Sequence, residues 1–275
     1  MSTTDFPAAH PVFRRVPAGS GLRWWAEGWQ SFLRAPLPWL GLSVALLVLL
    51  WIVGKLPLGG LLSQWLSLPL LALGAVFAAL LRRRWVEARR ITPAGMPLEP
   101  RTEGALGASA QLWKARIGPL LLASLLVLAI GGAAGAVLVL GLGALFGVGL
   151  ASVATFSHLM SPGAGVMAGA GAAAGGLMAL LLLLLLALYV LNVAFWFVNT
   201  LVVLGGVRPW DAVVLSVRAG LANLAPITLF TVLLLPIGMV AILPFGLGLL
   251  VLLPVLSGAS YASYHEVFGA AEPSA

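Results

Sequence analysis

The sequence contains no cysteine, and this absence removes several chemistries together. Without thiols the chain cannot form disulfides, thiolate metal sites or a cysteine nucleophile. Histidine is scarce as well: His10, His158 and His265 are the three that occur, and they fall on different sides of the apolar segments described below. A protein metal site needs convergent ligands, so the sequence predicts neither a metal nor a cofactor.

Charge is the second property that the sequence lacks. Charged residues are 8% of the chain and hydrophobic residues 61%, whereas roughly 25% of an ordinary soluble domain is charged. No Asp or Glu falls inside a long apolar run, although proton relays and cation pathways usually need one. The polar segments contain no Walker loop and no serine-nucleophile motif, and none is large enough for a catalytic domain. These absences argue against a proton-coupled pump and against an enzyme.

Long apolar runs dominate the rest of the sequence. About 20 apolar residues are needed to cross roughly 30 Å of hydrocarbon, and six segments have this character: 37–56, 61–81, 118–142, 178–204, 225–242 and 246–264. The last two come from one run, Ala225 to Tyr264. As a single helix this run would be about 60 Å long, so we predict a turn at Leu243-Pro244-Phe245-Gly246.

These segments predict an all-α fold, an integral membrane bundle of six transmembrane helices in three hairpins. The sequence Pro57-Leu58-Gly59-Gly60 supplies the tight turn of the first hairpin. We expect a single membrane domain over 22–264, a disordered cytoplasmic tail at 1–21 and a second cytoplasmic tail at 265–275.

The charged residues orient the predicted bundle. The chain has 15 basic and 8 acidic residues, and all of them except Lys55 fall on one side of the six spans. Since Lys and Arg are concentrated in cytoplasmic loops, we predict a multi-pass protein of the cell inner (cytoplasmic) membrane with both termini in the cytoplasm. The net charge of +7 is then explained by attraction to anionic lipids at the cytoplasmic face, and no nucleic acid is expected as a partner.

A short segment with helical periodicity precedes each odd-numbered span. In the first, a polar face of Arg23, Glu27, Gln30 and Arg34 lies opposite an apolar face of Leu22, Trp25, Trp29, Phe32 and Leu33. The segment 209–224 has a similar apolar stripe, and 105–116 has a weaker one. We predict interfacial amphipathic helices, anchored in the headgroup layer by Trp25, Trp29, Trp113 and Trp210.

An uncharged polar pattern marks the last three spans. Asn192, Trp196 and Asn199 follow i, i+4, i+7 spacing and therefore share a helix face. Polar residues of the fifth and sixth spans occupy similar depths, which gives a candidate cavity of Asn192, Trp196, Asn199, Thr228, Thr231, Ser257 and Tyr261. These side chains either line a polar cavity open to the cytoplasm or form hydrogen bonds between packed helices, worth about 0.6 kcal/mol each.

Two signatures at the ends of the chain carry a resemblance. Val16-Pro17-Ala18-Gly19 is followed by Glu27-Gly28-Trp29, and Tyr261-Ala262-Ser263-Tyr264 stands near the C-terminus. In these residues the chain resembles an uncharacterised family of bacterial multipass inner-membrane proteins. The resemblance covers the ends and leaves the Gly/Ala-rich stretch 131–176 unmatched. It implies the architecture, and it carries no catalytic or ligand-binding residue over to this chain.

The absence of a catalytic constellation leads to a non-enzymatic prediction. We predict a scaffold or accessory subunit of a membrane assembly, which docks on a membrane protein partner through its lead-in helices and basic loop. The alternative is a transporter-like protein that binds a neutral or lipidic solute in the polar cavity; an enzyme acting on lipid is a third possibility. A tunnel lined by Asn192 and Asn199 would favour the transporter, and a dry bundle would favour the scaffold.

Overall fold

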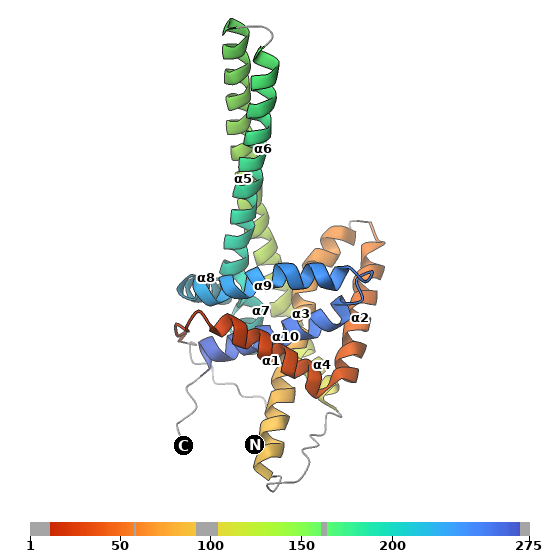
Figure 1. The fold of residues 1–275 in the computed structure, drawn as a ribbon. Helices are drawn as coiled ribbons and strands as arrows, with labels where there is room; N and C mark the ends of the chain where they lie inside the picture. The colour runs from red at the N-terminus through yellow and green to blue at the C-terminus, as the bar shows by residue number, and fades with distance from the viewer. Residues whose placement is uncertain (1–11, 58, 92–103, 161–163, 270–275) are drawn as a thin grey trace. The chain divides into compact units, whose positions relative to one another are not determined.

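The computed structural model describes residues 12–57, 59–91, 104–160 and 164–269, and every regular element in these ranges is a helix (Figure 1). In chain order the helices are α1 (Ser20–Arg34), α2 (Pro36–Gly54), α3 (Gly59–Ile91), α4 (Ala105–Ala115), α5 (Ile117–Met160), α6 (Ala164–Phe195), α7 (Val198–Val203), α8 (Pro209–Ala222), α9 (Leu224–Ile242) and α10 (Leu249–Phe268). The prediction of an all-α fold is confirmed for this part of the chain.

The chain divides into two compact units. One comprises Met1–Leu126 and Ala194–Ala275, and the other is Val127–Val193, which contains most of α5 and α6. The single membrane domain that the sequence predicted over 22–264 stays a prediction. α5 has 44 residues, which corresponds to about 66 Å, or twice the hydrocarbon thickness. The predicted span ends at 142 and 178 therefore fall inside continuous helices.

The predicted tails also differ from the structure. Residues 1–11 and 270–275 lie outside the described residues. The remainder of the predicted N-terminal tail is ordered by hydrogen bonds, and α1 already begins at Ser20. At the other end α10 continues to Phe268, beyond the predicted boundary at 264.

Five helical segments of the described chain are long and apolar enough to cross a membrane: Pro36–Gly54, Trp65–Ala88, Ile117–Gly149, Ala174–Val203 and Leu224–Ile242. They coincide with the first five predicted spans, as expected for a multi-pass membrane protein. The sixth predicted span falls on α10, which is not among them. Composition is the reason, because polar side chains are frequent in its second half, from Ser257 to Glu266.

α10 lies in the middle of the first unit. It packs against α1, α2, α3, α7 and α9, and Ser257, Gly258 and Ser263 are all buried in these contacts. A Cβ on Gly74 of α3 would overlap the hydroxyl of Ser257, so the two helices touch at this point. Protein covers part of α10, so Ser257 and Ser263 are buried, whereas Tyr261, Tyr264 and Glu266 are half-buried.

α1 packs along α10 through a face that combines glycines and serines with two aromatic side chains. Its buried residues are Ser20, Gly21, Trp24, Gly28, Ser31 and Phe32. A Cβ on Gly28 would overlap the carbonyl oxygen of Val255, and one on Gly258 would lie 2.9 Å from the Cα of Gly28. The missing side chains let the two backbones approach closely. Hydrophobic periodicity alone does not predict this face.

An aromatic core joins α1 to α2 and α3. The indole of Trp39 donates to the carbonyl oxygen of Ser31 at 3.0 Å and meets the ring of Phe77 edge-on, with centroids 4.7 Å apart. Phe32 and Leu81 belong to the same buried cluster. This core fixes the direction in which α2 leaves α1.

The fourth predicted span is not one continuous helix. A turn at Trp196 and Phe197 separates α6 from α7. The buried hydroxyl of Ser216 on α8 forms hydrogen bonds with backbone groups at this turn. It accepts the backbone N–H of Phe197 at 3.0 Å and donates to the carbonyl oxygen of Ala194 at 2.8 Å. Asn192 and Asn199 therefore stand on different helices, and not on the one continuous helix that was predicted to give them a shared face.

Candidate functional site: an arginine-lined pocket beside α1

The seven residues predicted to line one polar cavity occupy separate surroundings. Asn192 is exposed on α6 in the second unit, while the other six belong to the first unit. The indole of Trp196 donates to the hydroxyl of Ser263 at 3.1 Å. The hydroxyl of Thr228 donates to the carbonyl oxygen of Leu224, on its own helix, at 2.7 Å.

Three of the remaining predicted residues are buried or half-buried among helices. The side-chain oxygens of Asn199 and Thr231 are buried without a hydrogen-bond partner, and Ser257 packs on Gly74 as described above. Tyr261 lines the polar pocket considered next. Most of these residues thus contribute to packing between helices, and Tyr261 is the one that faces a described pocket.

The four predicted tryptophan anchors divide into two pairs. Trp25 stacks on Phe230 at 4.6 Å, and the indole of Trp113 donates to the carbonyl oxygen of Pro69 at 2.8 Å, so both are engaged by protein. Trp29 and Trp210 are 48% and 60% exposed. The exposed pair has the surface that an anchor in the headgroup layer requires.

One polar pocket of about 520 Å³ lies between α1, α3 and α10. Its lining is rich in charge for a chain with so few charged residues, and it comprises Arg23, Ala26, Glu27, Gln30, Ser31, Arg34, Ala78, Arg82, Trp85, Val86, Gly258 and Tyr261. Three arginines face one glutamate in this set. We call it the arginine pocket.

Ion pairs and ring contacts arrange the walls of the arginine pocket. Arg82 on α3 pairs with Glu27 on α1 at 3.0 Å, with side chains 33% and 45% exposed. The guanidinium of Arg34 lies 5.5 Å from the ring centroid of Trp85, a cation–π distance. The indole N–H of Trp85 is buried and has no hydrogen-bond partner. An unpaired buried donor beside arginines favours an acceptor as ligand.

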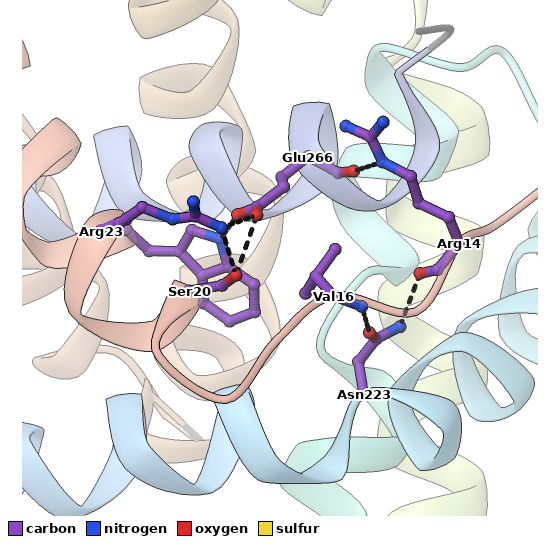
Figure 2. Close-up of polar contacts among 7 residues, drawn as sticks. Arg14, Val16, Ser20, Arg23, Asn223 and Glu266 are labelled. Atoms are coloured by element: carbon purple, nitrogen blue, oxygen red, sulfur yellow. Dashed lines mark hydrogen bonds and ion pairs between the residues drawn. The ribbon is translucent and has the colours of Figure 1, made fainter.

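A junction at Glu266 holds α1 in place beside this pocket (Figure 2). The carboxylate of Glu266 accepts hydrogen bonds from the hydroxyl of Ser20 at 2.8 Å and from the indole of Trp24 at 2.7 Å, and it pairs with Arg23. Arg23 also donates to the Ser20 hydroxyl at 2.7 Å. Glu266 therefore fixes the guanidinium that begins the arginine row of α1.

Asn223, between α8 and α9, fixes the segment before α1 (Figure 2). Its side-chain oxygen accepts the backbone N–H of Val16 at 2.8 Å, and its amide donates to the carbonyl oxygens of Arg14 at 3.2 Å and Ala219 at 2.9 Å. Asn223 is buried, and three of its hydrogen-bonding positions are used. The entry into α1 is thereby tied to the second half of the chain.

A second hollow lies on the other flank of α1, between α1, α9 and α10. Its volume is about 660 Å³, and its lining comprises Trp25, Ala26, Trp29, Leu233, Ile237, Val240, Ala241, Pro244, Gly248, Val251, Leu252 and Val255. No charged residue occurs in this lining. We call it the apolar groove.

Comparison with known proteins adds no relative. No protein-family model, curated protein or solved structure matches this chain. In the described residues, no group of three His, Asp or Glu side chains is arranged to hold a metal ion. The functional argument therefore rests on the geometry of the arginine pocket.

Sequence reasoning missed the arginine pocket, although part of its signal was present. Arg23, Glu27, Gln30 and Arg34 recur at spacings of three and four on the polar face of α1. That face was interpreted as the polar side of an interfacial helix in the headgroup layer, because periodicity alone gives no protein partner for it. Arg82 and Trp85 are the partners, and their position at the end of α3 was interpreted only as a basic loop.

Proposed function

We propose that the protein is a non-enzymatic integral membrane protein that holds an anionic group in the arginine pocket. One observation carries the proposal: Arg23, Arg34 and Arg82 line a single hollow of about 520 Å³ in which Glu27 is the one acidic lining residue. Specific small-molecule pockets have volumes of about 300 to 1,000 Å³. The anion is a phosphate or carboxylate, carried by a lipid or by a solute.

The chemistry of the lining supports an anion. A guanidinium presents its N–H groups in a fixed fork that matches the oxygens of phosphate and carboxylate groups. The Arg82–Glu27 pair is partly exposed, and such pairs contribute about 0 to 1 kcal/mol. An incoming anion can therefore replace Glu27 beside Arg82 at small energetic cost.

The proposal keeps six spans in three hairpins, with both termini in the cytoplasm and amphipathic lead-in helices. The backbone N–H of Arg14 donates to the carbonyl oxygen of Val267 at 2.9 Å, so the N-terminal segment and the end of α10 share one side of the membrane. An even number of crossings follows, whereas five helical segments of the described residues are long and apolar enough to cross a membrane. We assign the sixth crossing to α10, which protein covers on several sides.

Single-cysteine labelling tests this arrangement cleanly, because the chain has no cysteine of its own. Phe245, in the α9–α10 turn, is fully exposed, and Phe245→Cys should react with a membrane-impermeant maleimide added to the periplasmic side. Arg15→Cys should react only from the cytoplasmic side. If both react from the same side, α9 and α10 do not cross, and the number of spans falls from six to four.

Two cellular roles accommodate the pocket. In the first, the protein is the scaffold or accessory subunit of a membrane assembly, and the bound anion helps to seat it in the inner membrane. In the second, it is transporter-like, and the pocket receives a lipidic solute from the cytoplasmic side. The polar, open pocket supports the second role. The residues that carry it are Arg34, Arg82 and Tyr261, whereas the sequence had assigned this role to a cavity lined by Asn192 and Asn199.

The test of the proposed function uses a soluble anion. The purified protein in neutral detergent is titrated with sn-glycerol 3-phosphate by calorimetry, and saturable binding is expected. Arg34→Gln and Arg82→Gln should each weaken this binding about tenfold, since hydrogen bonds to charged groups contribute about 1.5 to 3 kcal/mol.

Arg218→Gln is the matched control, because Arg218 is exposed on α8 and does not line the arginine pocket. Its affinity should equal that of the unmodified protein. An equal loss in all three variants would indicate a general effect of net charge and would contradict a specific pocket. Absence of saturable binding would contradict the proposal outright.

A further inference from the structure

We infer that the ligand is one anionic phospholipid that lies across α1, with its headgroup in the arginine pocket and an acyl chain in the apolar groove. This inference rests on the proposed function, because it assumes that the arginine pocket binds an anion. It adds the chemical class of the ligand and a second part of its binding site.

The first argument is that the two hollows flank the same helix. Arg23, Glu27 and Arg34 face the arginine pocket, whereas Trp25 and Trp29 face the apolar groove. α10 also contributes to both, with Gly258 on one side and Val255 on the other. A ligand with one charged end and one apolar end matches this pair of surfaces.

The second argument is that Ala26 lines both hollows. Its side chain is a single methyl group, and it is exposed on the outer face of α1. The neighbouring apolar side chains on that face, Leu22 and Leu33, are 53% and 56% exposed. A chain that leaves the arginine pocket can therefore cross α1 over Ala26 and remain on apolar surface.

The third argument concerns what the groove accepts. Its walls are apolar side chains of α9 and α10, among them Leu233, Ile237, Val240 and Val251. A soluble anion bound by the arginines would leave this surface to water or bulk lipid. An acyl chain covers it, and in the delipidated protein each CH₂ group that the groove takes from water contributes about 0.8 kcal/mol.

Charge complementarity commits the site to a lipid over a partner helix. A transmembrane helix could cover the apolar groove, but an ordinary apolar helix offers nothing to Arg34 and Arg82. An anionic lipid satisfies the guanidinium groups and the groove with one molecule. Its phosphate would also supply an acceptor for the unpaired indole N–H of Trp85.

The experiment compares one headgroup with and without acyl chains. Native mass spectrometry and titration measure binding of phosphatidylglycerol, phosphatidylcholine and sn-glycerol 3-phosphate to the delipidated protein. The unmodified protein should bind phosphatidylglycerol at least about 100-fold more tightly than the soluble phosphate. Phosphatidylcholine should bind at least about tenfold more weakly than phosphatidylglycerol, because its headgroup has no net charge.

Two variants obstruct the path of the acyl chain. Ala26→Trp places an indole on the crossing point, and Val240→Trp fills the groove at a residue that is 65% exposed. Each should lower affinity for phosphatidylglycerol about tenfold. Val240→Trp, which lies outside the arginine pocket, should in addition leave binding of sn-glycerol 3-phosphate unchanged. Ala45→Trp, at an exposed site on α2, is the matched control and should change neither affinity. Thermal unfolding shows whether each variant is folded. If Ala26→Trp does not fold, Val240→Trp still tests the inference.

The outcomes separate the two proposals. If Arg34→Gln and Arg82→Gln leave binding of every anion unchanged, the proposed function fails. If they weaken binding while both tryptophan variants bind phosphatidylglycerol normally, the pocket is real and the lipid inference fails. Equal binding of phosphatidylglycerol and phosphatidylcholine would mean that bulk acyl chains alone occupy the groove, which also overturns the inference.

Discussion

The two units of the chain bury their apolar residues to different extents. In an 18-residue apolar stretch of each span, 59% of the residues are buried in Trp65–Ala88 of the first unit, whereas 0% are buried in Ile117–Gly149, most of which belongs to the second unit. An apolar side chain in lipid gains little from moving between lipid and protein, so membrane helices pack through shape and hydrogen bonds. The first unit therefore depends on particular residues, and the second depends mainly on hydrophobicity.

Glycine illustrates this difference within one residue type. In the first unit, Cβ atoms on Gly21 and Gly28 would overlap backbone atoms of α9 and α10. In the second unit, Gly132 and Gly143 have open space around them. Gly176 is an exception, because the ring of Phe146 occupies the position of its missing side chain. Substitution should accordingly be costly at the closely packed glycines of the first unit and mostly harmless in the second unit.

The largest effect should come from Gly28→Leu. The new side chain would overlap the carbonyl oxygen of Val255, which is backbone and cannot move aside. Overpacking typically costs about 1 to 3 kcal/mol, and a backbone clash belongs at or above that upper limit. We expect the thermal unfolding temperature in detergent to fall steeply for Gly28→Leu. Gly132→Leu should leave it unchanged, and an equal fall in both variants would contradict the contrast between the units.

Ser216→Ala should produce the next largest effect. It leaves the buried N–H of Phe197 without its acceptor, and an unsatisfied buried donor costs about 1 to 3 kcal/mol. The matched control is Ser152→Ala in the second unit, where an exposed hydroxyl donates to the carbonyl oxygen of Val148 on its own helix at 2.9 Å. Denaturation in mixed detergents measures both. If Ser152→Ala lost as much stability as Ser216→Ala, the hydrogen bonds of Ser216 would have no special role at the α6–α7 turn.

Trp113→Phe should have a smaller effect. It removes the hydrogen bond to the carbonyl oxygen of Pro69 but keeps most of the ring, and one such bond contributes about 0.5 to 1.5 kcal/mol. Trp210→Phe, at a site that is 60% exposed, should not affect unfolding in detergent. In liposomes Trp210→Phe should instead make α8 more accessible to aqueous quenchers, because an anchor at the headgroup level is weakened.

The smallest effect on stability is expected for Asn192 and Asn199, the two asparagines of the predicted polar cavity. Asn192→Leu replaces an exposed amide in the second unit and should change stability by about 0.6 kcal/mol or less. Asn199→Leu removes a buried oxygen that has no partner, so it should be neutral or slightly stabilising. Unfolding curves for both variants decide this. A loss above about 2 kcal/mol for either one would reveal a hydrogen bond that holds helices together.

Sequence reasoning was accurate where hydrophobicity alone determines the outcome. The five candidate spans among the described residues follow the apolar runs, and the α9–α10 turn occurs at Leu243-Pro244-Phe245-Gly246, as predicted. Span ends in the second unit were less accurate, because the Gly/Ala-rich stretch extends both helices without changing their apolar character. The glycine and alanine content of this stretch did not show whether it forms helix or loop.

Features that depend on pairs of distant residues were beyond sequence reasoning. The buried face of α1 includes Gly28, which packs on Gly258 of α10. Neither glycine, taken alone, predicts this contact. The break between α6 and α7 is stable because Ser216 is present, and no local pattern predicts it. The arginine pocket likewise needs α1 and α3 side by side, a contact made by side chains more than 50 residues apart in the chain, such as Glu27 and Arg82.

The contacts of Glu266 and Asn223 impose an order on biosynthesis. Ser20 reaches a carboxylate that is 246 residues further along the chain, and Val16 reaches an amide 207 residues away. At a translation rate of about 5 to 20 residues per second, α1 leaves the ribosome roughly 10 to 50 s before α10. During that interval its Trp24 indole and glycine face have no partner. A factor that shields nascent helices would therefore find its substrate at the start of this chain and release it when the last helix is made.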